Sequence, residues 1–326
     1  MTTHPRPGAG IDRRALLGLA LTGGVLAGCS DGGDPEPATT SSAPAPTTST
    51  PSPTATGTPD ADTDPSFVPN GLSSTQRTVY RYGEHYRQVS DLWLPTGERR
   101  DVLLVVVHGG GWEAGYDRRD INDLVGDMVG RGYPVLNVDY RGYGDGGGWP
   151  STFTDTATAV DLATVAATQF SLPQDRICLV GHSAGGHLAM WAAARRGLPQ
   201  GAPGADPRVV PALAASLSGV LHPSVAYGED ANVAGLFGGS PTDVPDRFTI
   251  GDPSRRAPYG MPLWAGAGTS DEVVPVSQTE FFCDTVRAAG DTVEEQLVPG
   301  ANHVAGKDPG GPIVPLFRTW LESRLG

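Results

Sequence analysis

The sequence predicts an α/β fold built on a mostly parallel, eight-stranded sheet with helices on both faces. Strand-like and helix-like segments alternate from about residue 75 onwards, which is typical of repeated strand–helix–strand units. The run DVLLVVVH at 101–108 is continuously apolar, as expected of a strand that is buried on both faces. Glycine or proline ends several of these segments, for example Pro95 and Gly97 after the second one.

Eight segments rich in β-branched, aromatic and other apolar residues predict the strands. They are, in chain order, 77–84, 86–95, 101–108, 133–140, 176–183, 209–219, 261–268 and 292–300.

Five helices are predicted where apolar residues recur every three or four positions. In the first helix Ile121, Leu124 and Val125 share a face, and Thr152 or Thr154 is expected to cap the second. The predicted helices are 118–132, 152–170, 184–197, 275–290 and 312–325. A glycine- and proline-rich stretch at about 220–260 is expected to form a short cap insertion.

The N-terminal 28 residues have the layout of a signal peptide. Arg13 and Arg14 precede the apolar run ALLGLALTGGVLAG, which is short for a membrane span. The run ends in LAGC, which resembles a bacterial lipobox and predicts lipidation of Cys29; the alternative is an ordinary signal peptide with an incidental cysteine. DRRALLG also resembles a twin-arginine export signal, although the usual aromatic residue after the arginine pair is missing.

Residues 29–65 consist mainly of Pro, Thr, Ser and Ala, a composition that buries too little apolar surface to fold. They are expected to form an extended tether between the lipidated cysteine and one catalytic domain at 66–326. The expected location is the outer face of a bacterial cytoplasmic membrane, with the domain exported and held there by its lipid anchor.

The charge of the chain excludes some partners. The formal charge is −13 and becomes two units more negative once residues 1–28 are removed, which argues against binding to nucleic acid or electrostatic docking on anionic lipid. Cys178 and Cys283 are expected to be buried free thiols, with a disulfide between them as the alternative. The cysteine and histidine spacing fits no metal site, and no metal or organic cofactor is expected.

A candidate nucleophile lies in GHSAGG, residues 181–186, at a predicted strand-to-helix junction. In G-x-S-x-G the flanking glycines allow a sharp, strained turn that lifts the serine hydroxyl above the sheet. Ser183 needs a base to accept its proton. His182 is expected to point away because it neighbours the serine, whereas His303 follows the last strand in a glycine-rich loop and can reach over the carboxyl edge of the sheet.

The acid that orients this base is expected between serine and histidine in chain order. Asp271 follows the seventh predicted strand in LWAGAGTSDEVVP, with Glu272 as the alternative. Its function would be to hold the imidazole of His303 in the correct tautomer and to stabilise the imidazolium ion.

The glycine run in VVVHGGGW suggests an oxyanion hole, because backbone N–H groups can approach an oxyanion only where no side chain intervenes. Gly110 and Gly111 are the first and second choices from this loop, and the N–H of Ala184 is a further donor. His108 is expected to shape the loop by hydrogen bonding. Pocket residues are expected to include Trp112, Trp149 and His222.

Over residues 75–325 the chain resembles the α/β hydrolases. HGGGW, GHSAGG, the aspartate of GTSDEVVP and the histidine of GANH together resemble the carboxylesterase branch with feruloyl- and acetyl-esterase-like enzymes, and arylformamidases share HGG-x-W and GHSAG. Hormone-sensitive-lipase-like esterases usually have Asp where this chain has His182. The resemblance implies a small-molecule ester substrate and hydrolysis through an acyl-enzyme. Because the cap is short and polar, we expect soluble short-acyl esters; an arylformamidase-like amide hydrolase and a non-catalytic envelope binding module are the alternatives.

Overall fold

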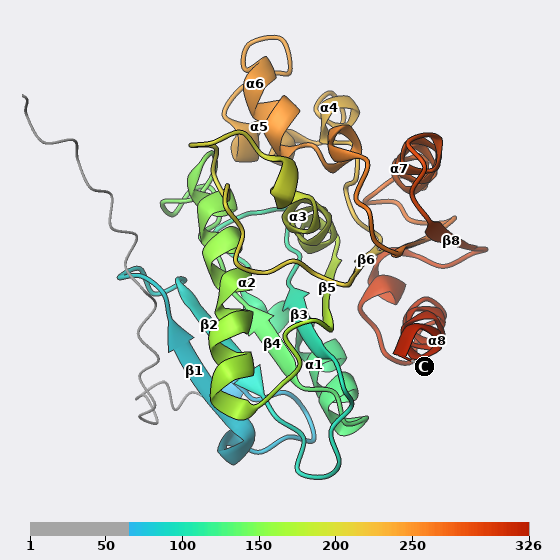
Figure 1. Cartoon of the computed structure of the whole chain (residues 1–326). Helices are drawn as coiled ribbons and strands as arrows, with labels where there is room; N and C mark the ends of the chain where they lie inside the picture. Colours follow the sequence, from blue (N-terminus) through green and yellow to red (C-terminus); the bar gives the residue numbers. More distant parts are fainter. Residues whose placement is uncertain (1–64, 326) are drawn as a thin grey trace, which may run out of the picture. The chain divides into compact units, whose positions relative to one another are not determined.

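The computed structural model describes residues 65–325, which contain the predicted eight-stranded sheet (Figure 1). The strand order is β1-β2-β4-β3-β5-β6-β7-β8. β1 pairs antiparallel with β2, and β2 pairs antiparallel with β4, whereas all other pairs are parallel. The predicted mostly parallel sheet is therefore confirmed. The predicted signal peptide, the lipidation at Cys29 and the predicted tether up to residue 64 lie outside the described residues.

The strands coincide with the predicted segments but are shorter at their ends. Their bounds are β1 Arg77–Arg81, β2 Val89–Trp93, β3 Leu103–Val107, β4 Val135–Val138, β5 Ile177–His182, β6 Leu213–Leu217, β7 Leu263–Gly268 and β8 Val293–Val298.

Helices cover both faces of the sheet, as predicted. Their bounds are α1 Asn122–Gly130, α2 Ser151–Phe170, α3 Ala184–Ala193, α4 Pro223–Ala226, α5 Ala231–Phe237, α6 Pro245–Gly251, α7 Ser277–Ala288 and α8 Val314–Leu325.

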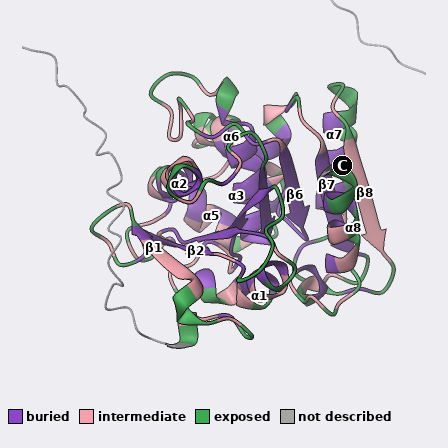
Figure 2. Cartoon of the chain, turned by 60° about the horizontal axis from the view of Figure 1, so that its bottom comes forward, coloured by how far each residue is buried: buried purple, intermediate pink, exposed green. Residues whose placement is uncertain are grey.

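Alternating residues of β3 supply two separate hydrophobic cores. Leu103, Val105 and Val107 pack in the cluster that includes α2, α3 and α7, whereas Leu104 and Val106 pack with α1 and α8. This alternation follows from the two-residue period of a strand. Figure 2 shows that β6 is buried while β8, at the sheet edge, is only partly buried.

Two helix starts differ from the sequence prediction. The segment 118–132 begins as a 3₁₀ turn, η3 (Arg118–Ile121), before α1. Pro150, not Thr152 or Thr154, is the N-cap residue of α2. Thr152 instead accepts a hydrogen bond from the N–H of Gly148 at 2.9 Å, because it lies inside the first turn and fastens the preceding loop.

The insertion between β6 and β7 is more regular than its composition suggested. It contains α4, α5 and α6 and the 3₁₀ turn η5 (Pro253–Arg256). Pro223 and Pro245 lie in the first turns of α4 and α6, where proline loses no helical hydrogen bond, and the side chain of Asp230 caps α5. The insertion is thus a set of short helices and not one long apolar helix.

Cys178 in β5 and Cys283 in α7 are buried free thiols and do not form the alternative disulfide. Burial raises the pKa of both, that of Cys283 to about 12, so neither is a reactive thiolate at neutral pH. Within residues 65–325 no helix is long and apolar enough to cross a bilayer.

Candidate active site

Ser183 forms the sharp turn between β5 and α3. Its φ of 57° and ψ of −125° are unusual for a residue with a Cβ and cost about 1–3 kcal/mol. The N–H of Ser183 donates to the carbonyl of Leu217 at 2.9 Å, and its own carbonyl accepts from the N–H of His187 at 3.2 Å. These bonds hold the strained turn, which is the conformation that the G-x-S-x-G motif predicts.

Both glycines of the motif are required by close backbone packing. A Cβ on Gly181 would lie 2.1 Å from the carbonyl oxygen of Gly185, and a Cβ on Gly185 would lie 2.1 Å from the carbonyl oxygen of Val107. Neither contact can be relieved by moving a side chain, because the obstructing atoms belong to the backbone. The first turn of α3 can therefore approach β3 only without side chains at these positions.

His303 and Asp271 form a hydrogen-bonded pair at the same edge of the sheet. Asp271 follows β7, and His303 follows β8 and begins the 3₁₀ turn η6 (His303–Gly306). Nδ1 of His303 lies 2.8 Å from Oδ2 of Asp271. Oδ1 of Asp271 accepts from the N–H groups of Val273 and Val274 at 2.9 and 2.8 Å. Because the carboxylate accepts the Nδ1 proton, Nε2 of the neutral imidazole is left with a lone pair.

The environment of Asp271 keeps its carboxylate ionised. Burial by itself would raise the pKa of Asp271, but the hydrogen bonds from His303 and from the N–H groups of Val274 and Val273 outweigh burial and hold the pKa below its usual value. The depressed pKa means that the charged form is present at neutral pH and that its stabilising contribution is lost only as the pH falls into the acid range.

Ser183 and His303 line one cavity of about 400 Å³, together with Gly110, Gly111 and Ala184. The structure thus brings the predicted nucleophile, the predicted base and all three predicted oxyanion donors to one place. They come from the carboxyl ends of β3, β5 and β8, which meet at the same edge of the sheet.

The glycine loop, Gly109–Gly111, presents backbone without side chains to this cavity. Gly110 has a φ of +97°, and a Cβ there would lie 2.2 Å from Cβ of Tyr116. Gly111 has a φ of +61°, and a Cβ there would lie 2.4 Å from Nδ2 of Asn232. Ala184 is the first residue of α3, so its N–H has no acceptor within the helix. That these N–H groups bind an oxyanion stays a prediction.

His108 contacts the glycine loop through its imidazole ring. Its Nδ1 lies 2.8 Å from the carbonyl of Gly109, and its Nε2 lies 3.1 Å from Oδ1 of Asp139. Arg118 donates to the other carboxylate oxygen of Asp139 at 3.0 Å. Both ring nitrogens of His108 are thus engaged, which leaves neither to accept a proton from Ser183. This is the loop-shaping position expected from the sequence.

Two residues expected in the pocket lie elsewhere. His222 and Trp149 are not among the described residues that line the cavity. Nδ1 of His222 lies 2.7 Å from the hydroxyl of Ser254, and its ring stacks on Phe281. Trp149 packs against Phe153, with ring centroids 5.1 Å apart. Both side chains anchor the loops outside the cavity, a result of long-range packing that the local sequence does not encode.

Trp112 lines the cavity but is 1% exposed, so it is mainly a structural wall. Its indole N–H donates to the carbonyl of Ala184 at 3.1 Å. The hydrogen bond ties the glycine loop to the first turn of the helix that follows the nucleophile.

Several polar residues of the cavity were not predicted from the sequence, among them His182, Lys307 and Asp120. His182 was expected to point away, yet its Nε2 lies 3.0 Å from the carbonyl oxygen of His303. Lys307 and Asp120 also line the cavity and form an ion pair at 2.6 Å. Lys307 follows His303 by only four residues, which was a weak local clue, but its partner is 187 residues away in the chain.

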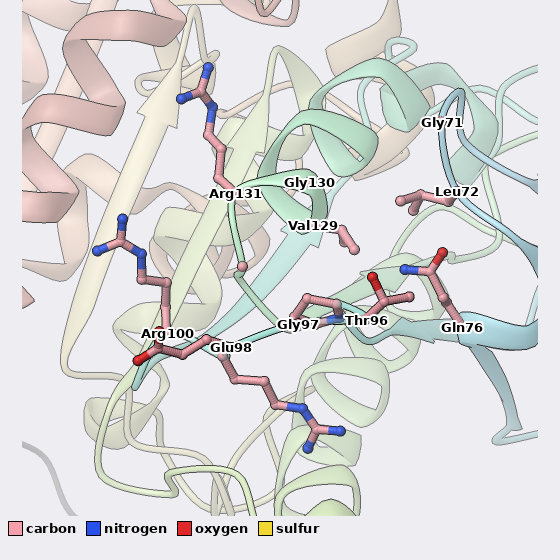
Figure 3. Close-up of a pocket in the computed structure, with 13 residues that line it drawn as sticks. Gly71, Leu72, Gln76, Thr96, Gly97, Glu98, Arg100, Val129, Gly130 and Arg131 are labelled. Atoms are coloured by element: carbon pink, nitrogen blue, oxygen red, sulfur yellow. The ribbon is translucent and has the colours of Figure 1, made fainter.

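A larger cavity of about 700 Å³ lies at the amino ends of the parallel strands, between the loop that precedes β3 and the turn that precedes β4 (Figure 3). Its lining contains three arginines and one glutamate but no serine, cysteine or histidine, and it contains none of the predicted site residues. Within residues 65–325, no group of three His, Cys, Asp or Glu side chains is placed to hold a metal ion.

Sequence comparison relates the chain to esterases. Residues 90–201 match the family model described as BD-FAE. The probable carboxylic ester hydrolase LipM of Mycobacterium tuberculosis is 27% identical over 63% of this chain and 50% of its own length. Esterase LipC of the same organism is 26% identical over 72% of this chain and 62% of its own length. The chain thus spans between half and two thirds of these relatives.

Structural comparison shows the fold. Esterase B from Lactobacillus rhamnosis superposes with a TM-score of 0.65 at 21% identity, covering 78% of this chain and 86% of that protein. A truncated carbohydrate esterase from gut microbiota superposes with a TM-score of 0.66 at 17% identity, covering 78% and 98%. These similarities, together with the sheet order, show an α/β-hydrolase fold.

Proposed function

We propose that this chain, an α/β hydrolase in fold, is a serine esterase that cleaves carboxylic esters through an acyl-enzyme. The observation that carries the proposal is that Ser183 and His303 line one cavity, while Asp271 bonds His303 from outside the cavity lining. The similarity to LipM and LipC supports ester hydrolysis as the reaction.

The proposed reaction uses the described residues in two halves. Oγ of Ser183 attacks the ester carbonyl while Nε2 of His303 accepts the hydroxyl proton, and the resulting imidazolium protonates the departing alcohol. Water then attacks the acyl-enzyme with His303 again as base, which releases the acid and restores Ser183. N–H groups of Gly110, Gly111 and Ala184 would stabilise the oxyanion, each contributing about 3 to 4 kcal/mol.

The cavity favours small, soluble esters. Its volume of about 400 Å³ is at the lower end of the range for small-molecule sites. Charged side chains border it, namely Glu113, Asp120, Glu229, Asp230 and Lys307. A long acyl chain would desolvate these groups without offering them hydrogen bonds, which is unfavourable.

We therefore expect p-nitrophenyl acetate and butyrate to have kcat/KM values more than about tenfold above that of p-nitrophenyl palmitate. Steady-state hydrolysis across the acyl series measures this directly, with an N-formyl anilide as a competing substrate. A long-chain optimum would contradict the small-ester proposal, and a preference for the formanilide would replace the ester with a formamide.

We further propose export and lipid anchoring through Cys29, supported by the run from Arg13 to Cys29. Replacing Cys29→Ala is expected to move the full-length protein from the membrane fraction to the soluble fraction of a bacterial host, because a lipid anchor supplies the membrane affinity. Fractionation followed by immunoblotting measures the distribution, with Cys178→Ala as the control. Equal membrane retention of both variants would contradict the anchor.

A further inference from the structure

His182 lies between the two loops that bear the proposed catalytic groups. It is the last residue of β5 and is 3% exposed. On one side its Nε2 lies 3.0 Å from the carbonyl oxygen of His303, and the centroids of the two imidazole rings are 4.6 Å apart. On the other side, a Cβ on Gly109 would lie 3.2 Å from Nδ1 of His182. The ring therefore bonds the loop that contains His303 and lies next to Gly109, the first residue of the glycine loop.

The hydrogen bond to His303 determines the tautomer of His182. A carbonyl oxygen can only accept, so Nε2 of His182 carries the proton and donates it. Nδ1 is buried and has no hydrogen-bond partner among the described residues. Burial, followed by the nearby charge of His303, lowers the pKa of His182 to about 3, so the ring is neutral throughout the neutral range.

The turn that begins with His303 rests directly on this ring. A Cβ on Gly306 would lie 2.8 Å from Cδ2 of His182, so the turn packs against the imidazole without an intervening side chain. The far end of the turn is fastened by the Lys307–Asp120 ion pair at 2.6 Å. Lys307 is four residues beyond the proposed base, whereas His182 bonds the backbone of His303 directly.

We propose that His182 is a positioning residue. Its Nε2–H donates a hydrogen bond to the carbonyl of His303, and this bond keeps the imidazole of the base oriented toward Ser183 and the glycine loop. This role rests on the proposed function. It explains why a buried histidine ends β5 even though its lowered pKa keeps the ring uncharged at neutral pH.

Two substitutions separate the hydrogen bond from simple space filling. His182→Leu keeps an apolar side chain of similar bulk but has no donor, whereas the amide of His182→Gln can reach the same carbonyl. We expect His182→Leu to lower kcat by about 10- to 100-fold with KM changed by less than about twofold, because displacing the base weakens the chemical step more than binding. His182→Gln is expected to recover most of the lost kcat.

His187→Leu is the matched control. His187 is also fully buried, also has a lowered pKa, of about 4, and also bonds a backbone carbonyl, that of Gly251 at 2.8 Å. His187→Leu changes only the side chain and keeps the backbone N–H that bonds the carbonyl of Ser183. We expect it to lose thermal stability, measured by circular dichroism, but to retain kcat within about twofold. A loss of kcat as large as that of His182→Leu would overturn the proposal, as would a His182→Gln variant no better than His182→Leu.

A spectroscopic readout keeps the test independent of substrate choice. The proton shared by Nδ1 of His303 and Asp271 should give a low-field proton NMR signal in the parent protein, in His182→Gln and in His187→Leu. We expect the signal to broaden or vanish in His182→Leu, and an unchanged signal would overturn the positioning role. A parent protein that shows the signal but hydrolyses no ester would contradict the proposed function and not the role of His182.

Discussion

Replacing Ser183 with alanine is expected to lower ester hydrolysis by about 10⁵- to 10⁶-fold, with the fold intact. Removing the nucleophile leaves His303 and Asp271 with no group to activate, and the residues of a catalytic triad act as a unit. The residue is 8% exposed and, within residues 65–325, its hydroxyl does not cap α3, so the substitution removes chemistry and little packing. Burst and steady-state kinetics with p-nitrophenyl acetate measure the loss.

Ser254→Ala is the matched control, because Ser254 also lies beside a histidine and an aspartate. Its hydroxyl is 2.7 Å from Nδ1 of His222 and 2.7 Å from Oδ1 of Asp252. This serine is not among the described residues that line the cavity. We expect it to retain activity within about threefold, since its loss perturbs only packing outside the site. Activity that survives Ser183→Ala but not Ser254→Ala would mean that the nucleophile was assigned wrongly.

Asp271→Asn is expected to lower kcat by about 10⁴-fold. The amide NH₂ of asparagine can donate to Nδ1 of His303, which favours the tautomer with the proton on Nε2. That nitrogen would then have no lone pair for the hydroxyl proton of Ser183. The variant also loses the negative charge that would stabilise the imidazolium formed in the reaction.

Glu272→Gln tests the neighbouring carboxylate that the sequence left as the alternative. Glu272 is exposed, whereas the side chain of Asp271 is fully buried and bonds His303. We expect Glu272→Gln to retain kcat within about twofold, because an exposed carboxylate contributes little to a buried hydrogen-bond pair. A pH–rate profile of the parent protein, Asp271→Asn and Glu272→Gln completes the measurement. A larger loss of kcat in Glu272→Gln than in Asp271→Asn would contradict the assignment of the acid.

The strands and the proximity of the three proposed catalytic groups could be predicted because each rests on local patterns joined by one rule of topology. A continuous apolar run such as 101–108 predicts a buried strand. In a parallel sheet the carboxyl ends of the strands meet at one edge. Ser183 ends a predicted strand, and Asp271 and His303 each follow one, so their meeting was expected from chain order. In the structure Ser183 and His303 line one cavity, and Nδ1 of His303 lies 2.8 Å from Oδ2 of Asp271.

The helix starts were less predictable. Threonine at 152 or 154 is a good capping residue by type, but Pro150 takes the N-cap position and Thr152 fastens the preceding loop. The same hydroxyl can satisfy a helix end or a loop, and the packing of the neighbouring loop against the sheet decides between them. The three short helices of the insertion were not anticipated, because each is too short to show a hydrophobic period.

Residues near one another in the chain thus indicate which segments become strands, which become the longer helices and which three groups are candidates for the proposed triad. The surroundings of those groups depend on contacts between distant segments. His182 bonds a residue 121 positions away, and Lys307 pairs with Asp120 across 187 positions. His222 was assigned to the pocket from its place after a strand, yet packing against Phe281 turns it away. Such contacts form only when the sheet order β3-β5-β6-β7-β8 brings separate loops together, and no local pattern encodes that order.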